Sequence, residues 1–217
     1  MSKHENEAMN AKQVATNERS AIARLDRATE DKLYARFHDY FLAAERGRAW
    51  NLWTDTPWEQ VVSPPPSELT VRVLEAYRDE LMLPDYSAKA LQILRASRGR
   101  AWFLTRWAYE EGKHLLALHE WLLRSKAYTD DQLRVMADGL LGTFAWEPLD
   151  EEPVAVLHEM QTWEQHEIER TTTLLSLAKD AGDNALTAIL MRTLADEKAH
   201  EAFLREVLEV IENTDSA

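Results

Sequence analysis

Apolar residues recur along most of the chain at steps of three and four, the spacing that places side chains on one face of an α-helix. The pattern predicts an early helix over about 21–47, four long helices over 67–97, 100–126, 152–181 and 184–212, and a shorter one near 129–142. Gly99, Gly182 and Pro153 stand at breaks between these segments, as helix ends favour. No segment alternates apolar and polar residues as a strand does, so the sequence predicts an all-α fold.

A length of 217 residues suits one domain with a sizeable core. The polar residues 1–17 predict a flexible N-terminal segment ahead of a single domain over 18–217. Between the first two predicted helices lies an irregular stretch with Trp50, Trp53 and Trp58, followed by three consecutive prolines. So many tryptophans indicate a loop that packs onto the body of the domain rather than a free linker.

Composition removes several classes of function. The chain has no cysteine, which excludes disulfides, iron–sulfur clusters and Cys-type zinc sites. Its net charge of −13 argues against sequence-independent nucleic-acid binding, which needs a surplus of Lys and Arg. No apolar run approaches the roughly 20 residues of a membrane span, and the N-terminus lacks the apolar core of a secretory signal. We therefore expect an acidic cytoplasmic protein that binds no membrane.

Four apolar stripes are interrupted by Glu and His, residues that a core normally excludes. The interrupting residues are Glu80, Glu111, His114, Glu164, Glu197 and His200. Two Glu–His pairs have the spacing i, i+3, which places carboxylate and imidazole on one helix face. One Glu from each of two helices and Glu-x-x-His from each of two others form the ligand set of ferritin-like di-iron bundles. Four carboxylates and two divalent cations also sum to zero charge. The alternative is a plain bundle with Glu and His at the edges of its stripes.

The motifs around these residues resemble those of the soluble acyl-carrier-protein desaturases, which belong to the ferritin-like di-iron superfamily. Residues 107–114 (WAYEEGKH) resemble the family's W-x-x-E-E-x-x-H helix, and residues 194–201 (LADEKAHE) resemble its A-D-E-K-x-H-E helix. Residues 80–86 (ELMLPDY) resemble E-E-x-L-P-x-Y, and Glu164 takes the place of the family's lone glutamate. Trp50 with Pro57 resembles the N-terminal loop, so the resemblance spans about residues 50–210.

This resemblance implies a ferritin-like four-helix bundle with additional flanking helices, holding two Fe ions. Manganese in place of one or both irons stays an alternative. The bridging ligands would be Glu111 and Glu197. The remaining ligands would be Glu80 and Glu164, each at one metal ion, together with His114 and His200.

Three further residues are candidates for a catalytic role. By resemblance, Asp196 would orient His114 and connect it to Trp50 as a route for electrons. Glu167 stands where the family usually has threonine. This extra carboxylate must stay protonated, bind a metal or point away, and it could donate a proton during oxygen activation. The ordinary alternatives are a solvated helix residue for Asp196, core packing for Trp50 and an exposed stripe edge for Glu167.

The implied function is O2-dependent oxidation of an unactivated C–H bond: desaturation of an acyl chain on an acyl carrier protein, with electrons from a ferredoxin-like donor. Arg95, Arg98, Arg100 and Arg106 cluster near one helix junction, where they are candidates for docking the acidic carrier protein. A solvated turn is the alternative for this cluster. The family is commonly homodimeric.

Two other functions stay open. The first is a di-iron hydroxylase or N-oxygenase of small-molecule biosynthesis, which Glu167 and the early end of the chain after the last ligand helix favour. The second is a ferritin- or rubrerythrin-like protein that handles iron or peroxide. The absence of cysteine counts against rubrerythrin, because its second iron centre is held by cysteines.

Overall fold

The computed structural model describes residues 25–143 and 145–215, and all regular structure in this part of the chain is helical. The elements are α2 (Arg27–Gly47), the 3₁₀ helix η1 (Trp58–Gln60), α3 (Ser67–Glu80), α4 (Leu83–Leu94), α5 (Arg98–Arg124), α6 (Asp130–Thr143), α7 (Pro153–Asp180) and α8 (Asn184–Asp215). The all-α prediction is confirmed. The flexible segment predicted over 1–17 and the predicted helix start near residue 21 lie outside the described residues.

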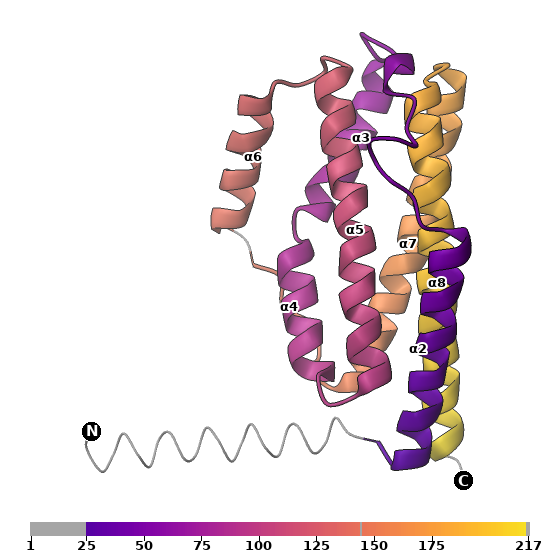
Figure 1. The fold of residues 1–217 in the computed structure, drawn as a ribbon. Helices are drawn as coiled ribbons and strands as arrows, with labels where there is room; N and C mark the ends of the chain where they lie inside the picture. The colour runs from indigo at the N-terminus through magenta and orange to yellow at the C-terminus, as the bar shows by residue number, and fades with distance from the viewer. Residues whose placement is uncertain (1–24, 144, 216–217) are drawn as a thin grey trace, which may run out of the picture.

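The long helices form a bundle (Figure 1). α7 packs along α8, while α3 and α4 follow one another along α5 and also contact α7. α2 packs against α5 and α8, and α6 lies at the outer edge of the bundle, on the left in Figure 1. The prediction of a helical bundle with flanking helices is therefore confirmed. No helix in the described ranges is long and apolar enough to cross a membrane.

The single helix predicted over 67–97 was wrong, because α3 ends at Glu80 and α4 begins at Leu83. Pro84 lies in the first turn of α4, where its missing N–H costs nothing. Inside a continuous helix its ring would clash with the carbonyl of the residue four positions earlier, which is Glu80. The break therefore makes Glu80 the last residue of α3.

The core consists of two apolar clusters stacked along the bundle. One includes Trp121 of α5 and Leu186 of α8, and the other includes Phe103 of α5 and Leu204 of α8. Trp50 and Trp58 pack into the first cluster, which confirms that their loop lies against the body. Between these clusters, both α5 and α8 carry the acidic and histidine residues that interrupt their stripes. The fold thus places a layer of acidic and histidine residues between two apolar clusters.

Candidate metal centre

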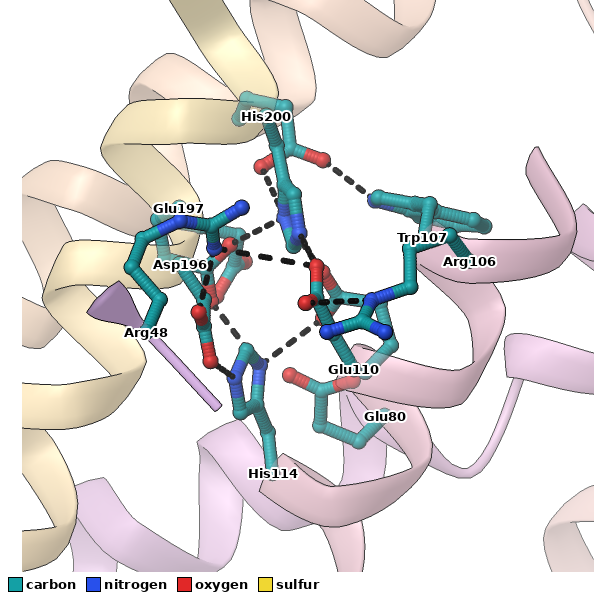
Figure 2. Close-up of polar contacts among 12 residues, drawn as sticks. Arg48, Glu80, Arg106, Trp107, Glu110, His114, Asp196, Glu197 and His200 are labelled. Atoms are coloured by element: carbon teal, nitrogen blue, oxygen red, sulfur yellow. Dashed lines mark hydrogen bonds and ion pairs between the residues drawn. The ribbon is translucent and has the colours of Figure 1, made fainter. Parts of the chain in front are cut away.

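The six residues predicted as metal ligands come together in this polar layer, and Figure 2 labels four of them: Glu80, His114, Glu197 and His200. α5 supplies Glu111 and His114, and α8 supplies Glu197 and His200, each pair one helical turn apart. α7 supplies Glu164 from a third direction, and the carboxylate of Glu80 arrives from the end of α3. All are buried except Glu80, whose side chain is 10% exposed.

Their ligand atoms fall into two groups, each with its atoms within 4.8 Å of one another. The first group is Glu80, Glu111, His114 and Glu197, and the second is Glu111, Glu164, Glu197 and His200. Glu111 and Glu197 belong to both groups. This is the arrangement in which two carboxylates lie between two cation positions, each completed by one further Glu and one His.

Several of these polar atoms have no hydrogen-bond partner within the described residues. They are Glu111 Oε1, Glu164 Oε2, both carboxylate oxygens of Glu197, and His200 Nδ1. A buried polar atom left without a partner costs about 1–3 kcal/mol, so proteins rarely contain several at one place. Metal ions would satisfy all five atoms together. The buried Glu and His groups therefore fit a metal ion in both donor type and placement.

The two imidazole rings are oriented by carboxylates behind them. His114 Nδ1 lies 3.2 Å from oxygens of both Glu111 and Glu197, while its Nε2 lies 3.4 Å from Asp196 Oδ2. His200 Nδ1 lies 3.0 Å from Glu111 Oε1, while its Nε2 lies 3.0 Å from Glu110 Oε2. In both rings Nδ1 faces the cluster and Nε2 donates to a carboxylate, the usual orientation of a metal-binding histidine.

Asp196 lies where the sequence predicted it. It is fully buried, and it accepts a hydrogen bond of 3.0 Å from Trp50 Nε1 in addition to its contact with His114. Arg48, at the end of α2, donates to its other oxygen at 2.5 Å. Burial by itself would raise the pKa of Asp196, but His114 and Trp50 stabilise its charged form and lower it. The structure thus connects Trp50, Asp196 and His114, while transfer of electrons along them stays a prediction.

Glu110 accepts a hydrogen bond from Nε2 of His200, as Asp196 does from Nε2 of His114. The sequence had given Glu110 no role. It is 1% exposed and accepts hydrogen bonds from Tyr40 (2.7 Å) and Arg106 Nε (2.8 Å) besides that from His200. Burial would raise the pKa of Glu110, but His200, Tyr40 and Arg48 outweigh it and lower the pKa. The only available signal was the doubled Glu of the 107–114 motif, because Glu110 lies beside the apolar stripe rather than on it.

A second missed contact comes from Trp107, on the same helix. Its Nε1 donates to Glu164 Oε1 at 2.6 Å and so fixes one oxygen of that carboxylate. The other oxygen, Oε2, is the one that lacks a partner and faces His200 at 3.4 Å. The motif over residues 107–114 predicts Trp107 as part of a helix but gives no sign of its hydrogen bond to Glu164.

Glu167 has a partner that the sequence analysis did not consider, because Arg170 lies one turn further along α7 and pairs with it. Arg170 also donates to Asp79 and lies 3.8 Å from Glu80 Oε1. Burial raises the pKa of Glu167 to about 8, with Arg170 opposing the rise and Glu197 adding to it. Glu167 is buried rather than at an exposed stripe edge, and it borders a cavity of about 10 Å³, room for about one water.

The protonation of the cluster follows from its burial. Burial, followed by neighbouring carboxylates, raises the pKa of Glu80 well above its ordinary value, and burial also raises that of Glu164. Burial would lower the pKa of His114 and His200, but the surrounding carboxylates outweigh it and raise both. Without a cation, the cluster therefore retains protons, which metal ions would displace.

Two of the four arginines proposed for docking a carrier protein, Arg100 and Arg106, pair inside the fold, whereas Arg95 and Arg98 are exposed. Arg100 is 1% exposed and pairs with Glu30 of α2. Arg106 pairs with Glu45 and Glu110, and its side chain is 11% exposed. These side chains hold α2 against α5, a tertiary contact that no local pattern reveals.

A family model described as a domain of unknown function, DUF892, matches residues 138–217. The match includes α7 and α8, and hence Glu164, Glu197 and His200, but not the ligands on α3 and α5. No curated protein and no solved structure matches the chain. The likeness to acyl-carrier-protein desaturases therefore rests on the motifs of the chain, and the matched family brings no activity with it.

Proposed function

We propose that the chain binds two iron ions between its helices and uses them to oxidise an unactivated C–H bond with O2. The observation that carries the proposal is the pair of four-residue groups that share Glu111 and Glu197 and contain five buried atoms without a hydrogen bond. Glu80 and His114 would complete one iron site, and Glu164 and His200 the other. Bound iron would supply the electrons that activate O2.

The surrounding residues prepare the site for this chemistry. Asp196 and Glu110 hold the two imidazole rings with Nδ1 toward the cluster. The apolar clusters above and below exclude water, which protects a reactive oxidant from side reactions. Glu167, with its pKa raised to about 8, can hold a proton at neutral pH and release it toward the adjoining small cavity.

The first form of this proposal is desaturation of an acyl chain on a carrier protein, with electrons from a ferredoxin-like donor through Trp50 and Asp196. The contact between Trp50 and Asp196 supports such a route, and a homodimer stays part of this expectation. The second form is a hydroxylase or N-oxygenase acting on a small molecule. It is favoured by the Glu167–Arg170 pair in place of threonine, and by the internal pairing of Arg100 and Arg106, two of the four arginines proposed for docking.

Reconstitution with ferrous iron, followed by reduction and exposure to O2, tests the proposal. The substrates should include carrier-bound acyl chains, free fatty acids and small amines, with products read by mass. Loss of two hydrogens indicates desaturation, and gain of one oxygen indicates insertion. A protein that forms no product from any substrate but stores many irons per chain would instead be an iron-handling protein.

His200→Ala provides the internal check, because loss of one ligand should lower bound iron and activity together. The matched control is His38→Ala, which removes a histidine from the exposed surface of α2. If His200→Ala retains the full iron content of the unmodified protein, the ligand assignment is wrong.

A further inference from the structure

A large cavity adjoins the candidate metal centre on the side of α4 and α7. Its volume is about 660 Å³, within the range of pockets that hold small-molecule ligands. The inner wall includes Trp107, whose indole nitrogen donates to Glu164 at 2.6 Å. One side chain therefore lies between this cavity and a residue of the metal cluster.

The cavity is a built site and not a gap between helices. The segment before α7, the covering segment, forms one wall of it and is held to α4 and α7. The backbone N–H of Trp146 donates to Asp85 of α4 at 3.2 Å, and that of Leu149 donates to Glu159 of α7 at 3.2 Å. Lys89 of α4 adds an ion pair of 2.8 Å with Glu147.

Aromatic rings form most of the remaining wall. The ring of Tyr86 lies 4.6 Å from that of Trp146 and 5.5 Å from that of Trp163, measured between centroids. Together with Trp107, four aromatic side chains from three helices and the covering segment line one space. Aromatic faces carry partial negative charge, so a group of them attracts a cation as well as an apolar body.

The charged residues of the lining have one sign. Asp150 and Glu159 belong to it, and no Lys or Arg does. The pKa of Tyr86 is raised to about 12, first by burial and then by surrounding carboxylates that include Glu159, which is consistent with a negative field inside the cavity. Of the two lining histidines, His158 faces Glu212 at 3.4 Å. A substrate carboxylate would find no cationic partner here and would face two acids.

We propose that this cavity binds an apolar small molecule that carries a protonated amine. The aromatic walls would enclose the apolar body, and Asp150 and Glu159 would face the ammonium group. That this molecule is oxidised at the metal centre rests on the second form of the proposed function. That the cavity binds it does not, because every residue that would hold it lies outside the two metal groups.

Three probes of nearly equal size and shape test this inference: 4-phenylbutylamine, 4-phenylbutanol and 4-phenylbutyrate. Their affinities are measured by calorimetry on the full chain, both free of metal and loaded with ferrous iron. Because a cation gains affinity at aromatic faces, we expect the amine to bind about two- to thirtyfold more tightly than the alcohol. The carboxylate should bind most weakly.

Two variants assign the effect to this cavity. Trp163→Leu should remove most of the preference for the amine, and Glu159→Gln should lower amine affinity while leaving alcohol affinity nearly unchanged. The matched controls are Trp102→Leu, at a 57% exposed tryptophan outside the cavity, and Glu75→Gln on the exposed side of α3. Both controls should keep the affinities of the unmodified protein.

Equal binding of amine and alcohol, tighter binding of the carboxylate, or no binding of any probe would overturn the inference. So would a preference that survives both cavity variants. These outcomes are independent of the proposed oxidase activity. Amine binding without turnover would count against the oxidase and leave the binding site standing, whereas turnover of an acyl chain without amine binding would do the opposite.

Discussion

The substitution Glu110→Gln tests whether the carboxylate behind His200 holds the metal cluster in place. Glutamine has the same size but carries no charge and presents one oxygen and one NH2 group. In the native protein one oxygen of Glu110 accepts from Tyr40 and His200, and the other accepts from Arg106. Whichever way the amide turns, its NH2 group faces at least one of these donors.

The expected cost follows from those contacts. At least one buried donor loses its partner, at about 1–3 kcal/mol, and the remaining hydrogen bonds lose the charge that strengthens them. We expect the free energy of unfolding of the metal-free protein to fall by about 2–4 kcal/mol. Metal affinity should fall about 10- to 100-fold, the usual effect of removing a carboxylate that orients a metal-binding histidine.

Urea denaturation of the metal-free protein measures the first quantity, and competition with a chelator measures the second. Glu120→Gln is the matched control, since Glu120 lies on the same helix but bonds only across one turn to Arg124 in a partly exposed pair. If Glu110→Gln changes both quantities as little as this control does, then the network behind His200 neither stabilises the fold nor supports metal binding, and the reasoning fails.

Three further predictions concern packing, charge and pH. Gly99→Ala should destabilise the protein by about 1–3 kcal/mol or more in thermal unfolding, because a Cβ there would lie 2.5 Å from the backbone carbon of Leu33. The control Gly139→Ala should leave stability unchanged, because the space around Gly139 is open. Equal effects of the two variants would contradict the close approach of α2 and α5. Above pH 8, where Glu167 is ionised, Arg170→Met should cost about 3–5 kcal/mol by leaving its charge unpaired, and adding Glu167→Met should restore most of that loss; a double variant no more stable than the single one would refute the pairing. Metal-free protein should lose stability between pH 4.5 and about 8, since Glu167 keeps in the fold a proton that the unfolded chain has already released; a metal-free melting temperature that rises across this range would contradict the shift.

The sequence was sufficient for the residues that lie on helix stripes. Glu111 with His114, and Glu197 with His200, could be found because the spacing of a helix is regular and because Glu and His in an apolar stripe demand an explanation. Glu164 followed in the same way. The structure also brings Glu80 to the cluster, although the helix around it was predicted as continuous and ends at that residue.

The residues behind the ligands were harder to predict, since their partners are distant in the chain. Glu110 contacts Tyr40, 70 positions earlier, and His200, 90 positions later. Nothing near Glu110 in the sequence points to either residue. The same reason explains why Arg100 and Arg106 were predicted to lie on the surface: their partners Glu30 and Glu45 lie on α2, and only the packing of that helix removes them from solvent.

Local spacing therefore determined the helices and their apolar faces, because both depend only on residues within a few turns. For the same reason it identified the six polar side chains on those faces, which can be buried only if a partner offsets the loss of water. Tertiary packing alone decided the rest. The meeting of α3, α5, α7 and α8 selected which atoms share a cation position, brought Arg170 of α7 to Asp79 of α3, and left an aromatic cavity beside Trp107. Such contacts join residues far apart in the chain, so their distances exist only once the helices have docked.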